Sequence, residues 1–127
     1  MAFKLAVIST DPSGVVCVAG YGEATASDFP TQQHMHFDMI LGADWATRRV
    51  ALDLDAVPYL DSSAIGWFIQ VQKQFRSAGG LLALYSVQPH VRNILHLLKI
   101  ERVVPIANDL PNALKMLQEQ PQPEVAA

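Results

Sequence analysis

The sequence predicts a single-domain α/β protein of one mixed five-stranded sheet, in which an N-terminal hairpin precedes parallel strands and about four helices flank the sheet. The order of the local patterns predicts it, because strand-like and helix-like segments follow one another as β-β-α-β-α-β-α-β-α. The length agrees, because 127 residues, half of them apolar, suffice for one hydrophobic core but not for two ordinary domains. No period of about 20 to 50 residues repeats, which excludes a solenoid.

The first two strands are expected at residues 3–8 and 15–19, joined by turn-forming residues at 11–14. Cys17 lies in the second of these strands and is expected to be an inert residue of the sheet or core. A single cysteine excludes an internal disulfide and fits a reducing cytoplasm.

A first helix is expected between residues 23 and 42, with several candidate caps at its start, Pro30 in its first turn and Gly42 at its end. The third strand is expected at residues 49–54. We expect this strand to be central, because apolar residues occupy both of its faces apart from one aspartate.

The second helix is expected to begin at Asp61, Ser62 and Ser63 and to end near residues 77–80. Its apolar positions follow the helical spacing, with Gln72 as the one polar interruption. A short buried strand should follow at residues 81–85.

A third helix is expected to start within residues 86–90, and residues 100–106 are expected to form a last strand, at an edge of the sheet because of Pro105. Asp109 should cap the final helix. The domain is therefore expected to span residues 1–117, with residues 118–127 as a flexible tail.

The charge and the motifs exclude several functions. The net charge is −3, with 9 basic and 12 acidic residues, and the basic residues are scattered, so nucleic-acid binding is not expected. No apolar run approaches the roughly 20 residues of a membrane span, and no signal peptide is recognisable, so a cytoplasmic protein is expected.

Motifs for catalysis are missing as well. The Gly-x-Ser-x-Gly elbow of hydrolases and the glycine-rich phosphate loop are absent. His34 and His36 lie two residues apart, a spacing that puts them on different faces of a helix, and His90 and His96 are expected to be structural. Neither an enzyme nor a metal or other cofactor is therefore expected.

Two interpretations of Asp61, Ser62 and Ser63 remain open from spacing alone. Either residue type can cap the helix, and a helix N-terminus also favours a phosphate or an oxyanion. Asp53 and Asp55 share one face of the preceding strand, at the edge of the sheet where α/β proteins form ligand crevices. The simpler interpretation is that these carboxylates solvate the end of the strand.

Three blocks, at residues 53–66, 78–84 and 88–100, together resemble the STAS domains and, among them, the bacterial anti-sigma-factor antagonists. Their order and spacing match over roughly residues 45–117. The resemblance implies a small mixed sheet flanked by helices, in agreement with the patterning.

The resemblance implies that Ser62, or less favourably Ser63, is phosphorylated by a serine kinase with an ATPase-like fold that is also the anti-sigma factor. The unphosphorylated antagonist binds this kinase and the phosphorylated form releases it; a phosphatase would be a further partner. The residues expected to bind the partner are Glu23, Tyr59, Asp61, Ser62, Ser63, Ala64 and Trp67. Tyr21 is a further aromatic candidate.

Two departures from the family pattern support an alternative. Ala64 stands where the family usually has glycine, and Gly20, Tyr21, Gly22 and Glu23 replace a loop that commonly reads Gly-Glu-Leu-Asp. The alternative is an unphosphorylated scaffold or ligand-sensing subunit of a transporter or signalling complex. The sequence leaves the oligomeric state open.

Overall fold

The computed structural model describes residues 3–24 and 37–119. The strands in these ranges are β1 (Lys4–Thr10), β2 (Val16–Tyr21), β3 (Arg49–Ala56), β4 (Leu81–Tyr85) and β5 (Ile106–Ala107). The helices are α1 (Phe37–Leu41), α2 (Ser62–Ala78), α3 (Pro89–Leu97) and α4 (Leu110–Glu119), with single 3-10 turns at Trp45–Thr47 and Ile100–Arg102.

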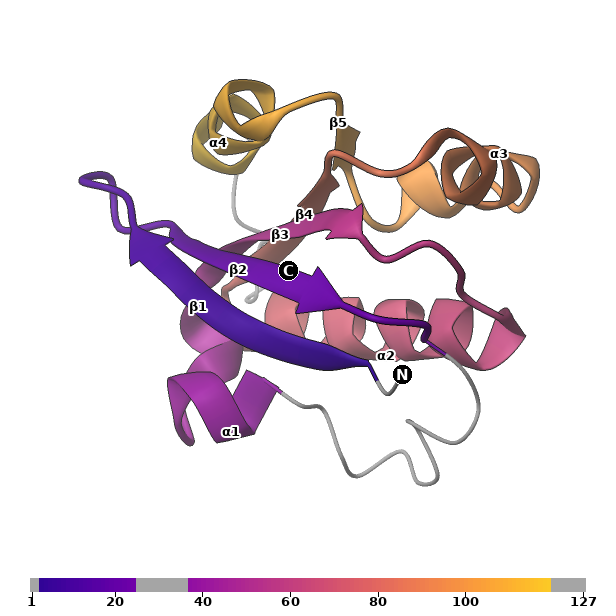
Figure 1. Ribbon diagram of the computed structural model, residues 1–127. Helices are drawn as coiled ribbons and strands as arrows, with labels where there is room; N and C mark the ends of the chain where they lie inside the picture. The colour runs from indigo at the N-terminus through magenta and orange to yellow at the C-terminus, as the bar shows by residue number, and fades with distance from the viewer. Residues whose placement is uncertain (1–2, 25–36, 120–127) are drawn as a thin grey trace.

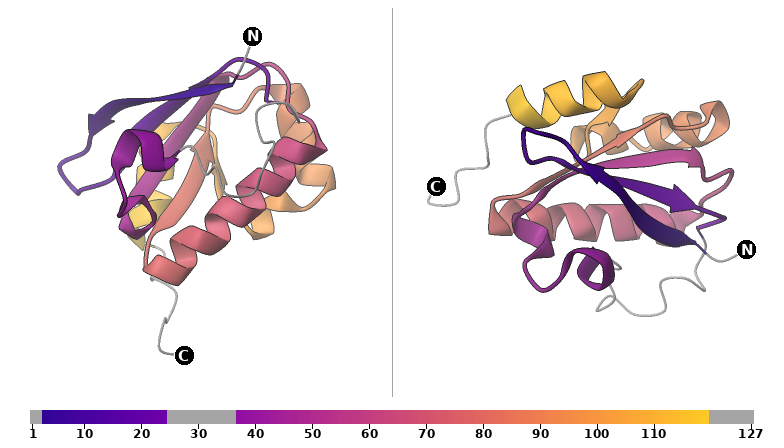
Figure 2. Two further views of the ribbon diagram at one scale, coloured as in Figure 1. Left: turned by 90° about the horizontal axis from the view of Figure 1, so that it is seen from below. Right: turned by 60° about the vertical axis from the view of Figure 1, so that its left-hand side comes forward.

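The five strands form one mixed sheet in the order β1-β2-β3-β4-β5. β1 runs antiparallel to β2, and every other neighbouring pair is parallel. The predicted fold class is thus confirmed, including the opening hairpin and the central third strand. α1 and α2 lie on one side of the sheet and α4 on the other (Figures 1 and 2).

Alternation along the central strands builds a core on each face of the sheet. Val50, Leu52 and Leu54 of β3 belong to the larger core, which also includes the buried face of α2. Ala51 of β3 belongs to the smaller core, which α4 covers. Because successive strand residues point to opposite faces, both halves of the alternating pattern are buried.

Gln72, the polar interruption in the helical pattern, is fully buried in the larger core. Its Nε2 donates to the carbonyl oxygens of Leu82 and Val103, both at 3.0 Å, and its Oε1 accepts from the Leu82 N–H at 3.0 Å. A buried amide costs little when its hydrogen bonds are satisfied. Gln72 therefore ties α2 to β4 and to the turn before β5.

The strand expected at residues 100–106 is wrong for most of its length. Ile100–Arg102 forms a 3-10 turn, and the N–H groups of Val103 and Val104 both donate to the Ile100 carbonyl at 2.8 Å. Ile100 and Val104 are buried, so the apolar spacing reflects packing of a coiled segment. Only Ile106–Ala107 pairs with β4, at the edge that Pro105 predicted.

The first helix can be compared only in part. α1 covers Phe37–Leu41 and ends at Gly42, whose φ of 90° is the left-handed conformation expected of a helix stop. The expected caps at residues 25–28, together with Pro30, His34 and His36, lie outside the described residues. At the other end of the chain, α4 continues through Gln118 and Glu119, and Asp109 accepts from the Asn112 N–H at 3.0 Å as its cap.

Substitution of Gly80 tests how tightly the turn between α2 and β4 is packed, and substitution of Gly66, outside this turn, is the control. A Cβ on Gly80 would lie 2.2 Å from the Ala46 carbonyl oxygen and 2.3 Å from that of Arg48. We expect Gly80→Ala to lower the free energy of unfolding by about 3 kcal/mol, since backbone must move. Gly66→Ala in α2 is the matched control: its Cβ meets nothing within 4 Å, and a gain of about 0.5–1 kcal/mol is expected. Urea unfolding curves distinguish the two; equal effects would contradict this packing.

Candidate functional site

A ladder of backbone hydrogen bonds joins the segment after β2 to the loop between β3 and α2. The Gly22 N–H donates to the Ala56 carbonyl at 3.1 Å, and the Ala24 N–H donates to the Tyr59 carbonyl at 3.0 Å. In return, the Asp61 N–H donates to the Ala24 carbonyl at 3.0 Å. The ladder places the Glu23 segment beside the loop that leads into Ser62.

Asp61 caps α2. Its Oδ1 accepts hydrogen bonds from the N–H groups of Ser63, at 2.9 Å, and Ala64, at 3.1 Å. Of the three candidate caps, the acceptor is therefore the aspartate, and Ser63 contributes a backbone donor. The interpretation as a cap is confirmed for Asp61 and leaves the Ser62 side chain uncommitted to it.

Ser62 is the first residue of α2 and is exposed, whereas Ser63 is half-buried. Ser62 lies on the solvent-facing side of α2, one helical turn before the exposed Gly66. A hydroxyl presented in this way is accessible to an enzyme that would modify it.

Two predicted contact residues belong to the core instead of the surface. Ala64 is fully buried, and Trp67 is only 5% exposed. Trp67 stacks on Phe37 with ring centroids 5.7 Å apart and meets Phe3 edge-on at 5.8 Å. Both residues lie on the face of α2 that packs against the sheet, so neither is exposed for contact with a partner.

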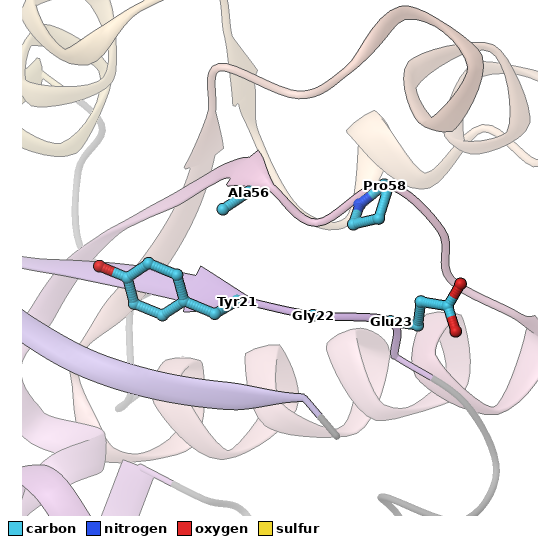
Figure 3. Close-up of a pocket in the computed structure, with 5 residues that line it drawn as sticks. All are labelled: Tyr21, Gly22, Glu23, Ala56 and Pro58. Atoms are coloured by element: carbon cyan, nitrogen blue, oxygen red, sulfur yellow. The ribbon is translucent and has the colours of Figure 1, made fainter. Parts of the chain in front are cut away.

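Two tyrosines flank the joined segments at the surface. Tyr21 is 44% exposed and Tyr59 is 46% exposed. Tyr21, Gly22 and Glu23 line a hollow of about 500 Å³ together with Ala56 and Pro58 of the neighbouring segment. Figure 3 shows the Tyr21 ring and the Glu23 carboxylate at opposite ends of this hollow. The hollow thus has an aromatic ring at one end and a carboxylate at the other.

The carboxylates of β3 differ in their surroundings. Asp53 is half-buried and pairs in register with Ala19 of β2 and Tyr85 of β4, and its Oδ1 accepts from the Asp55 N–H at 2.8 Å. Asp55 is exposed. Burial, then the negative charge of Asp53 and then Cys17 raise the pKa of Tyr85 to about 12. These contacts fit the simpler interpretation, in which the carboxylates belong to the strand end.

The remaining candidates have structural partners. Cys17 is buried in β2, as expected. His90 Nε2 is hydrogen-bonded to the Pro58 carbonyl, and His96 Nδ1 lies 3.0 Å from Glu101 Oε1.

Within residues 3–24 and 37–119, no three histidine, cysteine or acidic side chains are grouped so that they could hold a metal ion. Among the helices described, none has the length and apolar character needed to cross a membrane.

The STAS domain family matches residues 18–113, and the chain belongs to this family. It is 27% identical over 105 residues, covering 83% of this chain and 86% of the relative, to a Bordetella bronchiseptica protein named "Putative anti-sigma factor antagonist BtrV". The fold is similar to that of a Thermotoga maritima "putative anti-sigma factor antagonist", with a TM-score of 0.72, 23% identity, and coverage of 92% of this chain and 95% of that one.

The fold is also similar to that of SpoIIAA, an anti-sigma factor antagonist solved in two states. For the unphosphorylated form the TM-score is 0.56 at 12% identity, covering 94% of this chain and 100% of that one. For the phosphorylated form from Bacillus it is 0.56 at 16% identity, covering 90% and 97%. The sequence and fold comparisons thus agree on the STAS domain, and the relatives and solved structures named here are described as anti-sigma factor antagonists.

Sequence reasoning missed the part played by Gln88 and His90, which hydrogen-bond to the end of β3 and to the loop that follows it. Gln88 Nε2 donates to the Asp55 carbonyl at 2.7 Å, and His90 bonds the Pro58 carbonyl. The one available signal is Gln88 itself, because a helix that begins at a proline is usually preceded by serine, threonine, aspartate or asparagine.

Removing the Asp61 carboxylate tests the cap. Asp61→Ala leaves the Ser63 and Ala64 N–H groups without their acceptor, and we expect it to lower the free energy of unfolding by about 1–2 kcal/mol. Asp61→Asn keeps an acceptor and is expected to cost less than about 0.5 kcal/mol. Denaturant titration measures both; an Asp61→Ala variant as stable as Asp61→Asn would exclude the capping role.

The raised pKa of Tyr85 makes stability depend on alkaline pH. The folded protein favours the neutral phenol, so this contribution is present below pH 10 and is lost as the pH rises towards 12. We expect Tyr85→Phe to flatten the fall in unfolding free energy over this range by about 1–2 kcal/mol. Tyr59→Phe, at an exposed position, is the control. Urea unfolding at stepped pH measures the slopes, and identical slopes for wild type and Tyr85→Phe would refute the effect.

Proposed function

We propose that this protein is an anti-sigma-factor antagonist that binds a serine kinase/anti-sigma factor and is switched by phosphorylation at Ser62. The observation that carries the proposal is the exposed Ser62 hydroxyl at the start of α2, beside the capping carboxylate of Asp61 and the Glu23 segment. The matched family and its antagonist-like relatives support the class of partner.

The surface around Ser62 carries acidic and exposed aromatic side chains. Glu23, Asp55 and Asp61 bring negative charge to the carboxyl edge of the sheet, and Tyr21 and Tyr59 supply exposed aromatic contacts. Aromatic residues are enriched among the residues that dominate binding energy, and complementary charge guides association. These side chains would contact the kinase in the unphosphorylated state.

Phosphorylation would then work through charge. A phosphate adds about −1.5 to −2 charge beside Asp61, which raises the cost of burying the surface against a partner. A loss of about 3 kcal/mol in binding free energy weakens affinity by roughly two orders of magnitude.

The test is phosphorylation of the full chain by the serine kinase/anti-sigma factor of its own organism, with ATP, followed by mapping of phosphate by mass spectrometry. We expect modification at Ser62 and none in Ser62→Ala. Ser62→Asp should bind the kinase about 100-fold more weakly, as measured by calorimetry. The matched control is Ser77→Asp, an exposed serine at the other end of α2. Phosphate confined to another residue, or undiminished binding of Ser62→Asp, would overturn the proposal.

The second candidate, an unphosphorylated accessory subunit, is supported by the departures at Ala64 and in the Glu23 segment. Pull-down from the native cell with Ser62→Ala and Ser62→Asp separates the two. Equal capture of a transporter or a larger assembly by both variants, with no phosphate on the wild-type protein, would favour the second candidate.

A further inference from the structure

We propose that the connection between β4 and α3, together with the first two residues of α3 (residues 86–90), is a third part of the recognition site, in which Gln88 and His90 are positioning residues for the loop that presents Tyr59 and Ser62. The inference rests on the proposed function and adds a segment that does not itself contain the phosphorylated residue.

The end of β3 and the loop that follows it are held from two sides. On one side, the carbonyl groups of Ala56 and Tyr59 accept from the segment after β2. On the other side, the carbonyl groups of Asp55 and Pro58 accept from Gln88 Nε2, at 2.7 Å, and His90 Nε2. Four of the five carbonyls from Asp55 to Tyr59 are therefore bonded to segments that are remote in sequence.

The Gln88 side chain does not perform the helix capping that is usual at its position. It is the N-cap residue of α3, yet its side chain makes no capping hydrogen bond and reaches the Asp55 carbonyl instead. A shorter side chain of the types that favour this position would cap the helix but would not span to β3. The residue type therefore serves the contact with the loop at the expense of the helix start.

Ser86 shows a second departure from local preference in the same connection. Its φ is 55°, in the left-handed region that a non-glycine residue adopts only at a cost in free energy. The next residue, Val87, is buried and anchors the connection in the larger core. Strained backbone persists where the surroundings require it, and such positions gather at functional sites.

These contacts would aid binding by ordering the loop before a partner meets it. Tyr59 and Asp61 lie in a loop without regular secondary structure, so their placement depends on these cross-links. With the Gln88 and His90 contacts intact, the loop meets a partner already ordered, and less ordering entropy is lost on binding. Loss of the contacts would loosen the residues of this loop that lie outside the core, Pro58, Tyr59 and Asp61, while Val57 and Leu60 remain buried in the larger core.

The first measurement needs no partner. We expect His90→Ala to speed amide hydrogen exchange in residues 57–61 about tenfold, the effect of losing one hydrogen bond. His96→Ala, on the same helix but paired with Glu101, is the matched control and should leave this exchange unchanged. His90→Gln retains a donor and should restore protection. Equal exchange in His90→Ala and His96→Ala would overturn the inference.

The second measurement is Ser62 phosphorylation by the kinase. A positioning role predicts that His90→Ala and Gln88→Ala each raise KM about fivefold with kcat nearly unchanged, and that His90→Gln recovers most of the loss. A looser loop with an unchanged KM would overturn the role in recognition. If the wild-type protein is not phosphorylated at all, the proposed function fails, and the partner-binding part of this inference fails with it, whereas the exchange result stands by itself.

Discussion

Asp61 makes the contacts on which the arrangement of the site depends. Its backbone N–H bonds the Ala24 carbonyl, which fastens the loop to the segment after β2, and its carboxylate bonds the first-turn amides of α2. Its own carbonyl accepts from the Ile65 N–H at 3.1 Å, the first hydrogen bond of the helix. One residue therefore sets where α2 begins and how the neighbouring segment lies beside it.

The packing of α2 in the core explains why the exposed start of this helix, around Ser62, can stay ordered. α2 is held along its length by Phe68, Val71 and Phe75, all essentially buried, and by the three hydrogen bonds of Gln72. The residues that face solvent at its start carry little of this packing. Changes at Ser62 can therefore alter the surface without disturbing the fold, a separation that a modified regulatory residue requires.

The sequence predicted those elements whose conformation is determined by neighbouring residues. The alternation in β3 and the left-handed Gly42 and Gly79 follow from neighbouring residues, and these elements were predicted. Residues 100–106 were misassigned because Ile100 and Val104 satisfy a strand pattern while packing as a coiled turn. No local rule decides such cases, because the competing contacts are tertiary.

The site shows the same limit. Acidic and hydroxyl residues in a row offered several caps, and only the structure shows that Asp61 accepts the amides. Trp67 is equally plausible as an anchor or a core residue until its contact with Phe37 is known. Gln88 and His90 act on carbonyls 33 and 32 residues away, and no periodicity or cap rule can connect such positions.

The cap also bears on how a phosphate on Ser62 would act. A helix N-terminus normally draws an anion towards its free amides, which would pull the phosphate inward and stabilise the modified fold. Here the Ser63 and Ala64 N–H groups already bond the Asp61 carboxylate. A phosphate on the neighbouring residue would meet an occupied anion position and a like charge, so it would remain on the exposed side. Its charge would then stand beside the Asp61 carboxylate without being neutralised within the molecule, and a complex that buries both would bear their mutual repulsion and the cost of desolvating them, with little change of conformation.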